Sequence, residues 1–538
     1  MLTTLAAPAF AKEWYIEDGD ITVKASGTEG TNKVSQGANQ EVEDTDTIIT
    51  NRNEGTASSN TVTINAGNDK VEVTLEDVNI KSDSGSALTS SGDVTLTLKG
   101  DNSLTGGISG NGISSSGSLT ISGGEKDSLT AKGGSGLSGI FSSGGVTISG
   151  GTVNATGGSG ADGSGGSGIR TFSSGGVTIS GGTVNANGGD GGGGDYSGGG
   201  SGIYSGSGDV TISDGTVNAA GGDSGNGNYS TGGNGIYNGG RSGSITISGG
   251  TVTAKGGSGE DGEDGGDGIR SFDPVAISGG TVTAKGGSGE DGSGGRGIIS
   301  TKSVTISGGT VNANGGSGQN GNGGSGIIGS GRVAVSGGTV NAAGGDGGNG
   351  KDGGDGIYSS DIDLSGSLEL TAKAGSPNGK ALSQRGNELD LNTIKDKLGP
   401  GAKVTVTDAN GKVNQVSIPR PVEPEEPSSS SDGGSAAPSA PVSSLPGLTV
   451  TDKSGAVISY TSTQSGNTLT VCVGRLTASL HVSLAALRQL RAEGIETIAF
   501  QTILCSTTLS VDELLAMGGE DAEAVLTHRF TDSSLTVG

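Results

Sequence analysis

The central part of the chain repeats one pattern of alternating apolar and polar residues. At Val146 it reads VTISGGTVNA, and within VTIS and TVNA the apolar Val, Ile and Ala alternate with Thr, Ser and Asn. A period of two is the pattern of a half-buried β-strand. Because a Gly-Gly pair separates the two segments, we expect a sharp turn there, after which both strands face one interior.

Copies of this phrase recur along the chain at intervals of 27 to 35 residues. They begin at Leu119 (a looser copy), Val146, Val177, Val210, Ile245, Val275, Val304, Val333 and Ile362 (also looser). A constant phrase at a drifting interval predicts a solenoid in which the strands are conserved between turns and the loops vary in length.

A third apolar position recurs at Gly-Ile pairs between the copies. The isoleucines are Ile140, Ile169, Ile203, Ile236, Ile269, Ile298, Ile327 and Ile357. Three short strands per repeat, each turning one or two apolar side chains inward, describe one turn of a parallel β-helix. Each turn would pair with the next at about 4.8 Å, and stacking supplies the core that a single turn lacks. We therefore predict an all-β fold, a right-handed parallel β-helix with glycine-rich loops.

Two alternatives fit the pattern less well. Gly makes up 114 of 538 residues and aromatic residues only 3%, which is also the composition of a disordered linker. Disorder, however, would not place Val-x-Ile and Val-x-Ala at matched positions in every copy. A β-propeller needs roughly 40 to 45 residues and four longer strands per blade.

The pattern divides the chain into four parts. Residues 1–11 are apolar and end in Ala-Phe-Ala, which predicts the remnant of a signal peptide and hence a secreted or cell-surface protein. Residues 12–418 form the β-helix, with an N-terminal cap over about 12–60, where Trp14 covers the end of the stack, and long-loop repeats over about 119–360. Residues 419–447 are a Pro/Ser-rich linker, and residues 448–538 are a separate module.

The terminal module has the pattern of a small α+β unit. Residues 469–473 predict a strand, and Ser483 can cap a helix that carries apolar residues at helical spacing and ends at Gly494. Ser510 and Glu513 form a capping box before a second helix. The module resembles terminal modules of large secreted proteins from gut-type Firmicutes.

Composition restricts the partners. A formal net charge of −25 argues against nucleic acid, since phosphate binding needs clustered Lys and Arg. No apolar run approaches the roughly 20 residues of a membrane span. Cys472 and Cys505 are the only cysteines, and they are equally compatible with a disulfide and with two free thiols. We expect a monomer.

Carboxylates crowd the glycine-rich loops, which stack along one edge of a solenoid. The candidate ligands for a metal ion are Glu260, Asp261, Glu263, Asp264, Asp267, Asp352 and Asp355. Clustered oxygens on flexible glycine backbone suit Ca²⁺, which accepts six to eight oxygen ligands without strict geometry. The alternative is a solvated acidic edge that keeps the protein soluble.

The residue after each Gly-Ile pair is predicted to point outward, forming a stripe along one sheet. Its candidate carbohydrate-binding members are Phe141, Arg170, Tyr204, Tyr237, Arg270 and Tyr358, with Ile299 and Ile328 in the same column. Aromatic faces stack on sugar rings, and Arg pairs with uronate carboxylates. The alternative is that these side chains pack beneath the glycine loops.

The outward Asn residues of the TVNA segments have a mainly structural interpretation. Residues such as Asn154 and Asn185 can hydrogen-bond to one another along the stack.

The sequence gives little support for catalysis. The only histidines, His481 and His528, lie outside the repeats, and no copy departs from the pattern as a grafted active site should.

Three stretches resemble a known family. They are the opening WYIEDGDI from Trp14, the VEVTLEDVNI stretch from Val71, and the VTISGGTVNA copies, and they are similar to the clostridial carbohydrate-binding parallel β-helix family, a pectate-lyase-like solenoid. The resemblance covers most of residues 12–372. It implies calcium-supported binding of an acidic plant polysaccharide, such as polygalacturonate, without cleavage.

These observations together predict an exported, non-catalytic protein that binds an acidic, pectin-like polysaccharide, with calcium as a possible cofactor. The alternative is a structural adhesin stalk that has no glycan site and presents the terminal module. A polysaccharide lyase is the third and weaker alternative.

Overall fold

The computed structural model describes residues 12–419 and 447–537, apart from residues 54, 173–174, 261–262, 453–455, 459, 466, 474, 476, 503–505, 518–522 and 529–532. The predicted signal peptide remnant and nearly all of the predicted linker lie outside these residues. The chain forms two compact units, residues 1–423 and 424–538, each with its own hydrophobic core.

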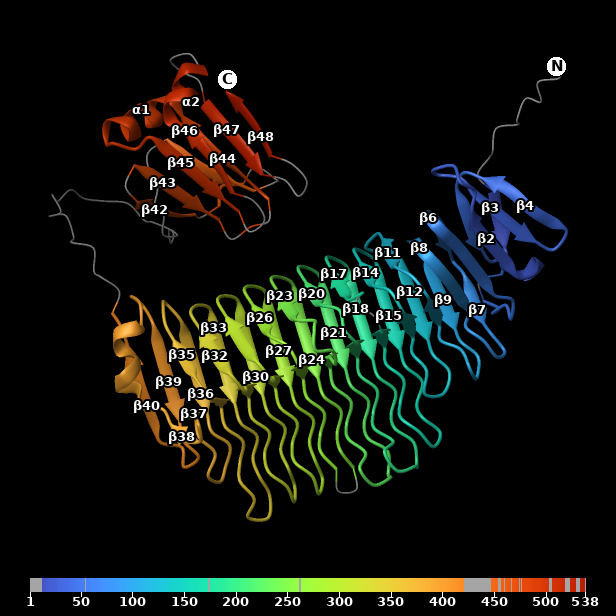
Figure 1. Ribbon diagram of the computed structural model, residues 1–538, viewed down its shortest axis with the longest axis horizontal. Helices are drawn as coiled ribbons and strands as arrows, with labels where there is room; N and C mark the ends of the chain where they lie inside the picture. The colour runs from blue at the N-terminus through green and yellow to red at the C-terminus, as the bar shows by residue number, and fades with distance from the viewer. Residues whose placement is uncertain are drawn as a thin grey trace, which may run out of the picture. The chain divides into compact units, whose positions relative to one another are not determined.

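The first unit is a parallel β-solenoid of about 14 turns (Figure 1), which confirms the predicted fold class. Its repeating turns contribute one strand to each of three faces. The Gly-Ile face consists of β10 (Ile113–Ser115), β13 (Ile140–Ser142), β16 (Ile169–Thr171), β19 (Ile203–Ser205), β22 (Ile236–Asn238), β25 (Ile269–Ser271), β28 (Ile298–Ser300), β31 (Ile327–Gly329), β34 (Ile357–Ser359) and β37 (Leu382–Gln384).

The other two faces come from the two halves of the repeated phrase. The VTI face consists of β11 (Leu119–Gly123), β14 (Val146–Ile148), β17 (Val177–Ile179), β20 (Val210–Ile212), β23 (Ile245–Ile247), β26 (Val275–Ile277), β29 (Ser303–Ile306), β32 (Arg332–Val335) and β35 (Ile362–Leu364). The TVNA face consists of β12 (Ser128–Lys132), β15 (Thr152–Thr156), β18 (Thr183–Asn187), β21 (Thr216–Ala220), β24 (Thr251–Lys255), β27 (Thr281–Lys285), β30 (Thr310–Asn314), β33 (Thr339–Ala343) and β36 (Glu369–Lys373).

Register is kept from turn to turn, so that equivalent residues stack. Val146 pairs with Val177 and Val153 with Val184 in parallel strands. The inward-pointing Val, Ile and Ala residues of the three faces are almost fully buried and belong to one continuous core. The second Gly of each Gly-Gly turn has a positive φ, 74° at Gly151, which explains why the turn needs glycine.

Polar ladders accompany this core. As predicted, outward Asn side chains bond along the stack: Asn185 donates to Asn154 at 2.8 Å and Asn218 to Asn185 at 2.9 Å. A second set of polar contacts, which we did not predict, lies at the buried last residue of most Gly-Ile strands. There Ser205 is fully buried and its hydroxyl donates to the carbonyl of Gly208 at 2.6 Å. Such bonds satisfy carbonyls that would otherwise be buried without a partner.

Both ends of the stack are covered. The N-terminal end comprises β1 (Lys12–Tyr15), η1 (Ile16–Asp18), β2 (Ile21–Ala25), β3 (Asn32–Gln36), β4 (Asn39–Asp44), β5 (Thr47–Thr50), β6 (Val62–Glu76), β7 (Asn79–Lys81), β8 (Leu88–Lys99) and β9 (Asp101–Thr105). Here the buried Trp14 indole donates to Asp44 at 2.7 Å. The C-terminal end has the antiparallel strands β38 (Asn387–Glu388) and β40 (Val413–Ser417), with η2 (Leu391–Lys397) and β39 (Lys403–Thr407).

The second unit is a small α+β module, as predicted. Its strands form two four-stranded sheets. The elements are β41 (Leu448–Thr451), β42 (Thr461–Ser465), β43 (Thr468–Cys472), β44 (Ala478–Ser483), α1 (Leu484–Ala492), β45 (Thr497–Gln501), β46 (Ser506–Ser510), α2 (Val511–Met517), β47 (Glu523–His528) and β48 (Ser533–Val537). Ser483 caps α1 by accepting from the amide of Ala486, which confirms its predicted role. Cys472 is a free thiol, and Cys505 lies outside the described residues.

The backbone of the glycine-rich loops is regular. Each loop has an outgoing arm that continues the TVNA face and a returning arm that leads to the next Gly-Ile strand, and the arms run as extended, parallel traces along one edge of the solenoid (Figure 1). In one outgoing arm, Gly188 and Gly191 donate to the following turn, whereas Gly189 and Gly192 donate to the preceding one. The remaining position, Asp190, is exposed. This period of three is that of a polyproline II helix.

Successive arms therefore form a glycine double layer. Glycines of the outgoing arms alternate with glycines of the returning arms in one chain of amide-to-carbonyl bonds of 2.8 to 2.9 Å. The chain runs through Gly158, Gly166, Gly189, Gly200, Gly222, Gly233, Gly257, Gly266, Gly287, Gly295, Gly316, Gly324, Gly345, Gly354 and Gly375. We predicted glycine runs outside the core, which is confirmed, but expected flexible backbone. The structure instead holds that backbone in a second hydrogen-bonded layer.

Candidate functional site

An aromatic–arginine patch lies on the Gly-Ile face, at the residue that follows each isoleucine. The side chain there points outward, since each of these strands alternates buried, part-exposed and buried residues. Strand pairing places Phe141, Arg170, Tyr204, Tyr237 and Arg270 on consecutive strands in that order. The structure thus brings five of the six predicted carbohydrate-binding residues together.

The sixth predicted residue, Tyr358, lies apart from the others. Ile299 and Ile328 occupy the two intervening strands of the column. Tyr358 is 38% exposed, and no aromatic or cationic neighbour contacts its ring among the described residues. It is therefore separated from the patch by two aliphatic positions.

Two phenylalanines that we did not predict complete the patch. Phe172 and Phe272 follow the outward residue by two positions, and Phe172 is 55% exposed. The ring of Phe172 lies 6.4 Å from that of Phe141, and the ring of Phe272 lies 6.2 Å from that of Tyr237. Their aromatic character at matched places in two copies was the available sequence signal.

The rings and guanidinium groups of the patch contact one another. Arg170 lies between two rings, with its guanidinium carbon 5.1 Å from the centroid of Phe172 and 5.2 Å from that of Tyr204. Tyr204 and Tyr237 meet edge to face at 5.2 Å. Burial raises the pKa of Tyr237, so its hydroxyl stays neutral. The patch is consequently a half-buried, preorganised surface and not a row of freely exposed side chains.

The two arginines of the patch differ in their electrostatic partners. Arg270 is paired with Asp267 at 3.0 Å, and that carboxylate is only 1% exposed and also lies 3.7 Å from Arg296. Arg170, by contrast, has no ion pair with any described residue, and its buried Nε has no hydrogen-bond partner. Arg170 is thus the unneutralised cation of the patch.

The carboxylates predicted to bind calcium mostly hold backbone amides of neighbouring turns. Glu263 accepts from the amide of Tyr229 at 2.5 Å, and Asp264 accepts from that of Ser293 at 2.6 Å. Such a bond satisfies an amide that the double layer leaves pointing to solvent.

Some of the remaining predicted ligands also accept hydrogen bonds from neighbouring turns, and the others do not. Asp267 accepts from the amide of Arg296 and Asp355 from that of Lys380, both at 2.7 Å, and Asp352 accepts from Asn378 at 2.9 Å. Glu260 is exposed, and Asp261 lies outside the described residues. Within the described part of the chain, no three His, Cys, Asp or Glu side chains are grouped as metal ligands.

Two tyrosines at the loop tips were missed in the sequence. Tyr196 and Tyr229 are 71% and 68% exposed and stack on each other, with centroids 5.2 Å apart and an interplanar angle of 17°. The available signal was that both follow Asp or Asn and precede Ser within otherwise glycine-rich loops.

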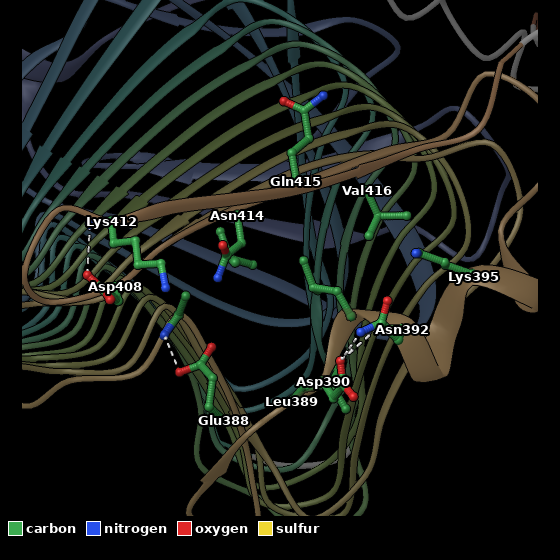
Figure 2. A pocket seen from close by; sticks show the side chains of 13 residues that line it. Glu388, Leu389, Asp390, Asn392, Lys395, Asp408, Lys412, Asn414, Gln415 and Val416 are labelled. Carbon is green, nitrogen blue, oxygen red and sulfur yellow. Dashed lines mark hydrogen bonds between the residues drawn. The ribbon is translucent and has the colours of Figure 1, made fainter.

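A cavity of about 630 Å³ opens at the C-terminal end of the solenoid, between β38, η2 and the β39–β40 hairpin (Figure 2). Glu388 accepts there from the amides of Ala381 and Leu382, and burial raises its pKa. Asp390 caps η2 through the amide of Asn392. Because these polar groups bond to the backbone of the last turn, we interpret the cavity as a structural feature of the C-terminal end of the stack.

A groove of about 480 Å³ lies where the TVNA face meets the outgoing arms. Lys255 and Lys285, neighbours on β24 and β27, line it together with Ser258, Ser288 and Lys373. Neither Lys255 nor Lys285 has an ion pair among the described residues. The groove belongs to a different face from the patch.

Comparison with known proteins adds no identification. No family model matches the chain, and neither curated proteins nor solved structures give a match. None of the helices in the described parts of the chain has the length and apolar character needed to cross a membrane. The class defined by the structure is therefore that of a parallel β-solenoid with a glycine double layer and an aromatic–arginine patch.

Proposed function

We propose that this is an exported, non-catalytic carbohydrate-binding protein that holds an acidic polysaccharide on the aromatic–arginine patch. The observation that carries the proposal is Arg170, an unpaired guanidinium between the rings of Phe172 and Tyr204. Arginine recognises carboxylates through two parallel hydrogen bonds, and adjacent rings can stack on the faces of the sugars. A uronate residue offers both features together.

The surrounding charge supports a selective site. The protein carries a net charge of −25, so a polyanion is repelled by most of its surface. Arg170 is a local exception, whereas Arg270 is neutralised by Asp267. A binding role without cleavage fits the patch, because Asp267, the carboxylate beside Arg270, is buried and engaged with two arginines and with the amide of Arg296.

Calcium support is a separate part of the proposal. Carboxylates of the loops accept from backbone amides through one oxygen, and a cation held by the second oxygen would bridge to a uronate. The alternative function, a stalk that presents the terminal module, is favoured by the length of the solenoid and by its covered ends.

A glycan array probed with the full chain, in Ca²⁺ and in EDTA, tests the proposal. We expect selective retention on polygalacturonate and related uronate polymers. Calcium support predicts weaker retention in EDTA. An absence of binding to every acidic glycan would contradict the proposal and leave the stalk. Release of unsaturated or reducing-end products from pectin would contradict the non-catalytic assignment.

A further inference from the structure

The stacked pair Tyr196–Tyr229 stands on the two longest loops of the glycine double layer. Residues 188–202 and 221–235 form loops of 15 residues each, whereas residues 157–168 before them and 256–268 after them form loops of 12 and 13. The tips of these two loops place two adjacent aromatic rings in solvent.

The backbone at both tips is in a conformation that bulky residues rarely adopt. Tyr196 has φ of 61° and Tyr229 has φ of 60°, in the left-handed region that glycine favours. A tyrosine is unfavourable for the fold at this position, because a residue with a Cβ is strained at positive φ. Glycine, the commonest residue of these loops, is not strained there. Burial does not compensate, since both rings are mostly exposed. An unfavourable backbone that presents an exposed aromatic residue points to a binding role.

Neighbouring residues hold the tips in place. The serines that follow the tyrosines, Ser197 and Ser230, are fully buried, and the amide of Ser197 donates to the hydroxyl of Ser230 at 2.9 Å. The hydroxyl of Ser197 in turn donates to the carbonyl of Asp162 at 3.1 Å. The amide of Tyr196 donates to the carbonyl of Asn228 at 2.9 Å. The two rings are thus preorganised, which reduces the entropy lost on binding.

We infer that the Tyr196–Tyr229 pair is a second carbohydrate site, which stacks on an uncharged pyranose ring. The rings supply apolar faces. Beside them Asp195 accepts from the amide and the side chain of Asn228, at 3.1 and 3.0 Å, and its other oxygen can accept from sugar hydroxyls. Residues 188–202 and 221–235 contain no Lys or Arg but do contain Asp190, Asp195 and Asp223. This charge disfavours a uronate and favours a neutral sugar.

The second site goes beyond the proposed function, because its charge preference is opposite to that of the Arg170 patch. The two sites can therefore be tested separately in one protein. A protein carrying both would hold a polysaccharide mixture at two places, with acidic chains on the Gly-Ile face and neutral chains at the loop tips.

The test is calorimetric titration of the full chain with neutral hexasaccharides of β-linked glucose, xylose and galactose. The double variant Tyr196→Gly/Tyr229→Gly removes both rings while it suits the left-handed backbone, so it should fold at least as well as the natural chain. We expect it to lose binding of the preferred neutral hexasaccharide by about tenfold or more. Tyr196→Phe/Tyr229→Phe keeps the rings and should stay within about threefold.

Three results would overturn the inference. They are the absence of binding by all neutral hexasaccharides, unchanged binding in the glycine variant, and saturable binding of a quaternary ammonium probe in place of sugar, which would make the rings a cation site. A fourth result, a fall in solution mass in the glycine variant, would also overturn it, because it would assign the pair to contact between copies of the chain. Uronate binding should be the same in all these variants, so that failure here is distinct from failure at Arg170.

Discussion

The amide of Gly200 donates to the carbonyl of Gly189 at 2.8 Å, across the two arms of a single loop. Gly189 donates in turn to Gly166 of the preceding turn at 2.8 Å. These bonds leave no room for a side chain, since a Cβ on Gly200 would lie 1.9 Å from the carbonyl oxygen of Gly166. Glycine is required here by close packing of backbones and not by a positive φ.

Gly200→Ala should therefore destabilise the solenoid. We expect a loss of about 1–3 kcal/mol in the free energy of unfolding, since the arms must separate to admit the methyl group. Urea denaturation measures the loss, and hydrogen exchange should locate faster amides in the loops that flank Gly200. The matched control is Gly163→Ala, where a Cβ meets no atom within 4 Å, and its effect should stay within about 0.5 kcal/mol. Equal effects of the two substitutions would contradict the close-packed double layer.

The buried ion pairs of Asp267 give a second prediction. Asp267→Asn removes the charge that Arg270 and Arg296 contact, and we expect a loss of about 1–3 kcal/mol of stability. The same substitution frees Arg270, so uronate affinity at the patch should rise. Denaturation and titration on one variant measure both effects.

The control for that experiment is to measure the stability of Asp267→Asn both in Ca²⁺ and in EDTA. If Asp267 acts through its arginines, the loss of stability should be the same in Ca²⁺ and in EDTA. Glu290→Gln, at an exposed carboxylate, should be nearly neutral in both. A loss seen only in Ca²⁺ would assign Asp267 to a metal site instead.

The repeated phrase was sufficient to predict the core. Val146 and Ile148 alternate with polar residues, and because register is kept, the same alternation in every copy determines which side chains stack inward. The Gly-Ile pairs predicted the third face for the same reason. Local periodicity of apolar residues carries this information without any knowledge of the neighbouring turns.

The double layer, the partners of Asp267 and the exposed loop-tip tyrosines could not be predicted in this way. The bond between Gly200 and Gly189 follows from how two arms fold back on each other, and glycine has no side chain to give a periodic signal. Asp267 was predicted as a metal ligand, but its partner Arg296 comes from the next turn, 29 residues away. The exposure of Tyr196 depends on the lengths of the neighbouring loops. Each of these features depends on contacts between turns.

The terminal module should lose stability in acid through His528. Its ring is fully buried beside Phe500 and bonds to the hydroxyls of Thr502 and Thr507, and burial lowers its pKa below the ordinary value of 6.5. As pH falls below 6.5, the unfolded chain takes up a proton that the folded module resists, so unfolding becomes more favourable.

Thermal melting of the module between pH 7.5 and 5 measures this effect. The melting temperature should fall less steeply with pH in His528→Gln than in the natural chain. His481→Gln, at a part-exposed histidine, gives the comparison for loss of a histidine that is not buried. An unchanged slope in His528→Gln would contradict the assignment.

The most direct test of the account is the affinity of Arg170→Gln for polygalacturonate oligomers, measured by titration at low and at moderate salt. Loss of a charge-assisted hydrogen bond corresponds to about 1.5–3 kcal/mol, or roughly 10- to 150-fold in affinity. Lys285→Gln removes an equal charge from the TVNA face and should bind within about twofold of the natural chain. A loss in Arg170→Gln alone is the predicted result. Equal affinity of both variants and the natural chain would contradict the patch as the binding site.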